Sequence, residues 1–171
     1  FRVLCVMIRV VSTLILFCFS LSLSGMELPK ADRVLVKKSE RKLLLFKNGE
    51  AFRHYDIALG DSPRGHKQFE GDEKTPEGTY TLDWRNNNSK FYRSIHISYP
   101  NEQDQQFALQ QGRDPGGMIM IHGRPNKQKD PISAWVLDRM DWTDGCIAVK
   151  NDEMDEIWAA IDNGTPIEIH P

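Results

Sequence analysis

The chain is poor in cysteine. It contains three, and Cys5 and Cys18 lie in a hydrophobic N-terminal segment with the features of a removable signal. Loss of that segment would leave Cys146 as the only thiol, which excludes an intramolecular disulfide in the mature chain. A single thiol in an exported protein is either a small buried hydrophobe or a reactive group.

Other absences exclude further classes of function. The sequence has no basic run and no alternation of basic with aromatic residues, so we expect no nucleic-acid partner. Its remaining histidines are scattered and do not show the spacing of a zinc site, so we expect no metal. Beyond residue 25 no apolar run approaches the roughly 20 residues that span a bilayer, so we expect no permanent membrane span.

The N-terminus follows the pattern of a secretory signal peptide. Arg2 and Arg9 supply the positive charge, the range 10–23 is apolar, and Ser22 and Ser24 are the small residues before a cleavage site. We therefore predict a signal over residues 1–25 and one domain over 26–171, located in the periplasm or cell envelope. An uncleaved anchor is the alternative reading. The predicted domain of 146 residues is large enough for one hydrophobic core, and loss of two arginines lowers the formal net charge from −2 to −4.

Alternating apolar residues predict a mostly β domain. The expected strands are 33–38, 42–47, 50–59, 79–84, 94–99, 118–121, 145–149 and 165–169. Asn48-Gly49 is a strong hairpin signal between the second and third strands. Residues 60–78 and 85–90 are rich in glycine, proline, asparagine and charge, and they predict loops, with a tight turn at 74–78.

Two or three segments favour helices. The range 101–111 predicts a short helix that Gly112 ends, and the range 131–140 is weakly helical. A third helix is expected after the cysteine, capped by Asn151 or Asp152. Its apolar residues fall on one face: Met154, Ile157, Trp158 and Ile161.

Cys146 and His122 are the candidates for chemistry. A thiol nucleophile needs a base or cation nearby, and His122 ends an apolar strand where a ring is held firmly. The backbone N–H groups of Gly145 and Cys146 are candidate oxyanion donors. Gly123 and Gly145 would let a substrate backbone approach closely. Each feature alone is better explained as structural, whereas the combination in a chain with one remaining thiol favours a reactive pair.

At these motifs the sequence resembles the L,D-transpeptidase catalytic domain (the YkuD fold). The range 119–123 ends in His122-Gly123 and resembles the family's His-Gly strand end, and the range 143–147 resembles its Ser/Thr-His-Gly-Cys signature. The form of the range 141–146 is similar to the branch related to the YafK murein enzymes. The resemblance covers most of the mature chain and implies a mostly β, sandwich-like fold with one or two short helices, one of them after the catalytic cysteine.

The resemblance also implies a reaction. Cys146 would attack the amide between diaminopimelate and D-alanine in a peptidoglycan stem peptide, with His122 as general base and acid. A thioester would then pass to an acceptor amine, from another stem or an envelope protein, or to water. No cofactor is required.

Two positions depart from the family pattern. Asp144 replaces the family's second histidine, and Ala148 stands where many members carry an arginine. A carboxylate at position 144 would stabilise an imidazolium if it reached the ring, would disfavour a thiolate if it lay near sulfur, or would be a turn residue only.

Neighbouring residues have open roles. Arg124 is a candidate for binding a substrate carboxylate or a solvated loop residue, Trp142 walls the cleft or packs, and Thr143 is a candidate for holding His122.

Four functions follow from this reading. The leading one is an L,D-transpeptidase. An L,D-carboxypeptidase or other hydrolase with the same residues is the nearest alternative. A non-catalytic peptidoglycan-binding domain and, more remotely, a general thiol protease are the others.

Overall fold

The computed structural model describes residues 28–127 and 130–171 and contains one curled sheet with three helices. The strands are β1 (Arg33–Lys37), β2 (Lys42–Lys47), β3 (Glu50–Asp56), β4 (Gly78–Ser89), β5 (Tyr92–Ile97), β6 (Met120–His122), β7 (Ile147–Ala148) and β8 (Thr165–His170). The helices are α1 (Glu102–Gln110), α2 (Pro131–Leu137) and α3 (Asn151–Ala160). The mostly β prediction is confirmed, although three helices are present rather than one or two. The predicted signal, residues 1–25, lies outside the described residues.

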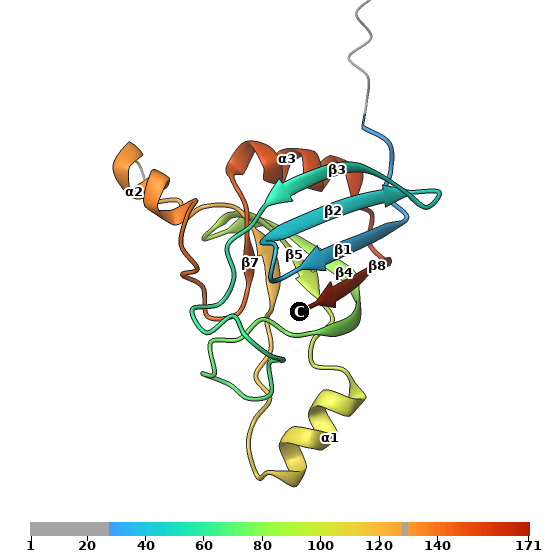
Figure 1. The fold of residues 1–171 in the computed structure, drawn as a ribbon, viewed down its shortest axis with the longest axis vertical. Coiled ribbons are helices and arrows are strands. Elements are labelled where there is room, and N and C mark those ends of the chain that lie inside the picture. The colour runs from blue at the N-terminus through green and yellow to red at the C-terminus, as the bar shows by residue number, and fades with distance from the viewer. Residues whose placement is uncertain (1–27, 128–129) are drawn as a thin grey trace, which may run out of the picture.

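The sheet has the order β3-β2-β1-β8-β4-β5-β6-β7 (Figure 1). Most neighbours are antiparallel, but β1 pairs in parallel with β8, and β6 pairs in parallel with β7. The last strand of the chain therefore lies in the middle of the sheet, between β1 and β4. The first hairpin turns at Asn48 and Gly49 with φ of 52° and 84°, which are the positive values that the predicted two-residue turn requires.

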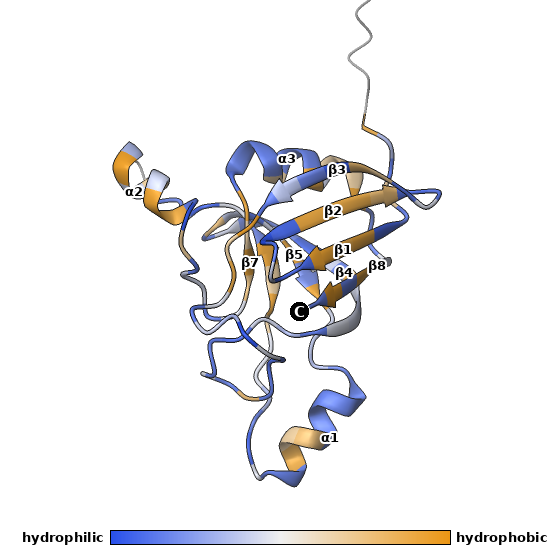
Figure 2. Ribbon diagram, viewed as in Figure 1, coloured by the Kyte–Doolittle hydropathy of each residue, from blue (hydrophilic) through white to orange (hydrophobic). Residues whose placement is uncertain are grey.

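Burial of the strands explains why they form one core. Figure 2 shows hydrophobic colour concentrated in β1, β2 and β8. Val34 and Val36 of β1 are completely buried, as are Leu43 and Leu45 of β2 and Ile167 of β8. Such alternation of buried and less buried positions is typical of strands with one face on a core.

Helix α3 covers this core with the face that the sequence predicted. Met154, Ile157 and Ile161 are completely buried, and Trp158 packs partly buried against the core. The predicted cap is wrong by one or two residues, because Lys150 occupies the N-cap position and its N–H donates to Glu153 Oε2 at 3.0 Å. Asn151 instead accepts a hydrogen bond from the backbone N–H of Arg124 at 2.8 Å.

The predicted loop over 85–90 is also wrong. Strand β4 continues to Ser89 and pairs with β5, with Asn86 opposite Ser94. Backbone pairing supplies the hydrogen bonds there, so this stretch forms a strand without the apolar alternation that a sequence pattern requires. The Arg85 guanidinium lies 4.9 Å from the ring centroid of Trp158, where it stacks on the core helix.

None of the helices in the described part of the chain has the length and apolar character that a bilayer crossing requires.

Candidate active site

Strand pairing brings His122 and Cys146 to one face of the sheet. In the parallel ladder of β6 and β7, His122 is opposite Ala148, and Ile121 is opposite Ile147. Cys146 precedes β7 and is level with Met120, whose N–H donates to Sγ at 3.4 Å. Side chains alternate along a strand, so Met120, His122, Cys146 and Ala148 share a face. His122 and Cys146 are thus diagonal neighbours, and the spacing of strands puts their Cα atoms about 7 Å apart along the strands and about 5 Å apart across them.

The ring of His122 is buried and oriented by its own backbone. It is 3% exposed, and Nδ1 lies 2.7 Å from the carbonyl oxygen of Gly123. A carbonyl only accepts hydrogen bonds, so Nδ1 carries the proton and Nε2 of the neutral ring is left as an acceptor. Burial lowers the pKa of His122 to about 4, against the partial opposition of the Gly123 carbonyl. The ring is therefore neutral at pH 7.

Aromatic side chains enclose this histidine. The ring centroid of Phe91 lies 4.6 Å from that of His122, and the centroid of Trp142 lies 5.6 Å away in an edge-to-face arrangement. Trp142 therefore packs against the ring, and its indole Nε1 is buried without a hydrogen-bond partner among the described residues. Phe91 was not singled out from the sequence, because an isolated aromatic residue gives no signal of which ring it will contact.

Cys146 is partly exposed, and its thiol is held by backbone groups. Sγ accepts from the N–H of Met120 and lies 3.6 Å from the carbonyl oxygen of Met118, to which the thiol donates. Burial raises the pKa of Cys146, the Met120 N–H lowers it, the charge of Asp144 raises it and that of Lys67 lowers it. Of the roles considered for Asp144, the effect on the sulfur is the one that this arrangement supports. Lys67 was not identified from the sequence.

Thr143 holds the cysteine turn rather than His122. Its buried hydroxyl donates to the carbonyl oxygen of Cys146 at 2.7 Å and accepts from the N–H of Gly145 at 3.1 Å. The N–H of Gly145 is therefore already engaged, which does not fit its expected role as an oxyanion donor. The N–H of Cys146 has no acceptor among the described residues and is the donor that remains.

The two glycines make room for protein atoms rather than for substrate. Gly145 has φ of +123°, and a Cβ there would lie 2.5 Å from the carbonyl oxygen of Lys74. A Cβ on Gly123 would lie 2.6 Å from Asn151 Oδ1 and 2.9 Å from Cβ of Tyr92. A larger residue at either position would force these neighbouring atoms to shift, and at Gly145 the atom in question belongs to the backbone.

Arg124 is paired inside the protein. Its guanidinium makes a bidentate contact with the carboxylate of Asp138, with nitrogen–oxygen distances of 3.0, 2.6 and 2.5 Å. From the sequence, Arg124 was expected either to be solvated or to bind a substrate carboxylate. The structure shows neither, because its guanidinium is paired with Asp138. The ion pair ties the segment after His122 to the end of α2. A hollow of about 360 Å³ next to it is also lined by Trp142 and Ala148.

Within residues 28–127 and 130–171, no group of three or more histidine, cysteine, aspartate or glutamate side chains is arranged to hold a metal ion.

Comparison with known proteins identifies the domain. The model of the L,D-transpeptidase catalytic domain matches residues 31–169. The chain belongs to the L,D-transpeptidase catalytic domain family. It is 33% identical over 132 residues to YafK of Escherichia coli K12, a protein provisionally named an L,D-transpeptidase. That match covers 73% of this chain and 45% of YafK.

Two solved structures share the fold. The helical cell shape determining protein Pgp2 of Campylobacter jejuni superposes with a TM-score of 0.62 at 27% identity, covering 80% of this chain and 46% of Pgp2. Bd1075 of Bdellovibrio bacteriovorus superposes with a TM-score of 0.55 at 26% identity, covering 82% of this chain and 48% of that one. The chain thus spans about half the length of these relatives.

Proposed function

We propose that the protein is a cysteine-dependent acyl transferase that acts on peptidoglycan stem peptides, with Cys146 as nucleophile and His122 as general base. The observation that carries this proposal is the shared face of the two side chains at β6 and β7, together with a ring whose Nε2 has no partner among the described residues and so can accept a proton. Membership of the L,D-transpeptidase family supplies the substrate class.

The reaction begins with transfer of the thiol proton. As Sγ attacks the carbonyl carbon of the diaminopimelate–D-alanine amide, its proton passes to Nε2 of His122. Negative charge develops on the carbonyl oxygen, where the N–H of Cys146 is the candidate donor. The intermediate collapses with release of D-alanine, whose amine takes the proton from His122. A thioester on Cys146 remains, and an acceptor amine resolves it to a new amide and the free thiol.

Both partners are neutral in the resting state. The pKa of Cys146 is raised by burial, and the pKa of His122 is lowered to about 4 by the same cause. Loss of the thiol proton therefore accompanies the attack on the carbonyl instead of preceding it as a stable thiolate–imidazolium pair. As the pH is lowered, activity should accordingly fall with a midpoint near pH 4 and not near 6.5, the ordinary pKa of histidine.

Hydrolysis is the second candidate. Cys146 is partly exposed, so water as well as an amine can reach a thioester there. The product would be a shortened stem, or a wall polymer cut from an attached envelope protein. Both outcomes share the first half-reaction.

The place of action follows from the N-terminal pattern. We propose that residues 1–25 direct export and that residues 26–171 form the domain that acts in the periplasm or cell envelope.

The test is incubation of the 26–171 domain with purified tetrapeptide muropeptides, with and without an acceptor amine, followed by intact-protein mass spectrometry and product analysis. We expect release of D-alanine and a Cys146-dependent adduct or dimer. Cys146→Ala should abolish turnover while the fold is retained, and His122→Gln should nearly abolish it.

The other outcomes separate the candidates. D-alanine release with only a tripeptide product, whatever the acceptor, would assign hydrolysis. Full turnover by Cys146→Ala would exclude both covalent mechanisms. Wall binding without any product, preserved in Cys146→Ala, would assign a binding domain.

A further inference from the structure

Two buried lysines bind the segment 61–77, Lys38 from outside it and Lys67 from within it. Lys38 is 2% exposed and donates to the carbonyl oxygens of Gly65 and Thr75 at 2.7 and 2.8 Å and to Glu77 Oε1 at 2.8 Å. An ammonium group has three hydrogens, and all three are used. Lys38 therefore joins the two ends of the segment, which is a structural role.

Lys67 is buried as deeply but is bonded less completely. It is 3% exposed, and its ammonium donates to the carbonyl oxygen of Phe69 at 3.0 Å and to Asp72 Oδ1 at 2.8 Å. No described residue accepts the third hydrogen. A buried cation normally has its donors satisfied, so the incomplete set at Lys67 calls for a functional explanation.

Asp72 fixes this lysine in place. Its Oδ2 accepts from the N–H groups of Gln68 and Phe69 at 2.7 and 3.0 Å, and its Oδ1 accepts from Lys74 at 3.1 Å. These bonds and the ion pair with Lys67 hold the pKa of Asp72 below its usual value in spite of burial. The carboxylate is thus charged at neutral pH and turned into its own loop.

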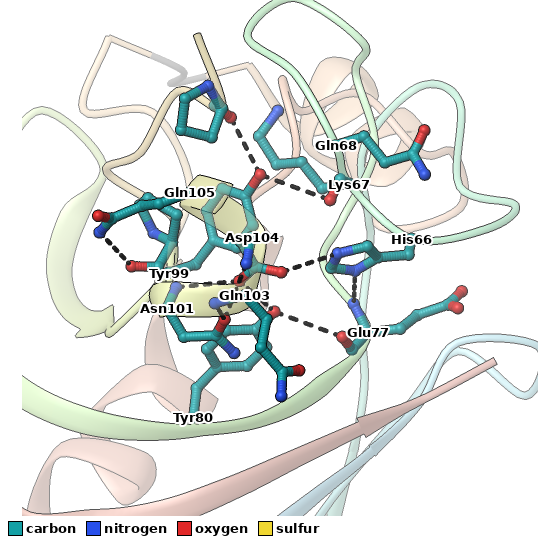
Figure 3. A network of polar contacts seen from close by, with 12 residues as sticks. His66, Lys67, Gln68, Glu77, Tyr80, Tyr99, Asn101, Gln103, Asp104 and Gln105 are labelled. Carbon is teal, nitrogen blue, oxygen red and sulfur yellow. Dashed lines mark hydrogen bonds and ion pairs between the residues drawn. The ribbon is translucent and has the colours of Figure 1, made fainter. Parts of the chain in front are cut away.

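The backbone around Lys67 is anchored on its other side, as Figure 3 shows. The hydroxyl of Tyr99 is shared between the carbonyl oxygens of Pro115, at 3.0 Å, and Lys67, at 3.4 Å. The preceding ring of His66 accepts from the N–H of Glu77 at 2.9 Å and bonds Asp104 Oδ1 at 3.0 Å. The network of Figure 3 therefore leaves this stretch little freedom to move.

The same segment packs against the cysteine turn. The N–H of Asp61 donates to the carbonyl oxygen of Thr143 at 3.0 Å, next to a bridge between Gly60 and Thr143. The carbonyl of Lys74 lies so close to Gly145 that no side chain fits there. A charge held in this segment is consequently held at a fixed place relative to the sulfur of Cys146.

We propose that Lys67 is a fixed positive charge that supports ionisation of Cys146, with Asp72 as the residue that positions it. The inference rests on the proposed function for its role in turnover. When the S–H bond breaks, the proton goes to His122 Nε2 and the electron pair stays on sulfur, so the negative charge forms within the field of a cation that needs no rearrangement. Burial of the thiol and the charge of Asp144 oppose the same step, and Lys67 offsets them in part.

The test is the pH dependence of alkylation of Cys146 by iodoacetamide, followed by intact mass, since this reaction requires the thiolate but no substrate. Lys67→Met removes the charge and keeps the length of the side chain. We expect the midpoint of the profile to rise by about one pH unit, so that alkylation at pH 7 slows about tenfold. Lys67→Arg should remain within about threefold of the parent protein.

Lys38→Met is the matched control, because it removes a second buried lysine that binds the same segment from outside it. It should lower stability and leave the alkylation midpoint unchanged. An unchanged midpoint in folded Lys67→Met would overturn the proposal, as would an equal shift in folded Lys38→Met, because loop packing and not charge would then be responsible.

Where Lys67→Met does not fold, the double variant Lys67→Met/Asp72→Asn keeps one amide oxygen that accepts from the loop N–H groups and carries no charge at either position. A rise in midpoint relative to the single variant Asp72→Asn is expected, since these two proteins differ only in the charge of Lys67, and no rise would overturn the proposal. Turnover by Cys146→Ala would contradict the proposed function but would leave this alkylation result readable by itself.

Discussion

Burial of a neutral histidine makes the stability of this domain depend on acid in a defined window. His122 has a pKa of about 4 in the folded protein and an ordinary value of 6.5 when unfolded. Between these pH values the unfolded chain binds a proton that the folded protein does not, so stability rises with pH through the window and is fully present above 6.5. The shift corresponds to about 3 kcal/mol of the free energy of unfolding at pH 4 and about 2 kcal/mol at pH 5.

The variant His122→Gln isolates this contribution, because glutamine also donates to the Gly123 carbonyl but does not titrate. Urea denaturation of both proteins at pH 7, 6, 5 and 4 gives the free energy of unfolding at each pH. Relative to the variant, the free energy of unfolding of the parent should fall by about 3 kcal/mol from pH 7 to pH 4. Carboxylates such as Asp72 lose stability in acid in both proteins and cancel in the difference. Parallel curves for the two proteins would refute the buried, neutral state of His122.

Three further predictions concern the cysteine turn. Thr143→Val should lower the free energy of unfolding by about 2–4 kcal/mol, because it leaves the Gly145 N–H and the Cys146 carbonyl without their buried partner. Thr143→Ser keeps the hydroxyl and should cost less than about 1.5 kcal/mol, and thermal and urea denaturation measure both variants. Gly145→Ala should cost at least about 2 kcal/mol and slow turnover, because its Cβ would meet the Lys74 carbonyl at a positive φ; a fully stable variant would show that the turn is free to move. Asp144→Asn should speed alkylation of Cys146 at pH 7 by about twofold to threefold, because the carboxylate raises the pKa of the thiol; an unchanged rate would remove Asp144 from the electrostatics of the site.

The sequence allowed most of the strands to be predicted because their buried residues alternate. It also placed the helix after the cysteine and the hairpin at Asn48-Gly49. The extension of β4 over Arg85 to Ser89 was missed, because those residues pair through their backbones and carry the side chains of a loop. An alternating sequence pattern reflects which side chains are buried, and few side chains are buried in this part of the hairpin.

The candidate site shows a similar division. The motif residues His122 and Cys146 were recognisable in the sequence, and pairing of β6 with β7 explains how a separation of 24 residues places them on one face. The role of Thr143 was misassigned, because a hydroxyl gives no sign of which of several nearby backbone groups it will bond. Lys67 was missed because its segment has only the composition of a loop, and its burial depends on contacts with residues far away in the chain.

The central place of β8 has a consequence for how the chain folds. Val34 and Ile167 are opposite each other in the sheet although they are separated by 133 residues. Without β8, the sheet would be divided into β3-β2-β1 on one side and β4-β5-β6-β7 on the other. Pairings of such long range are slow to form, because most of the chain must be brought together before they are made. The two halves can therefore pair through β8 only when residues 165–170 are present. Closure of the sheet is thus a late step in folding, with the bridge between Ala58 and Ala148 as a further backbone link between its two sides.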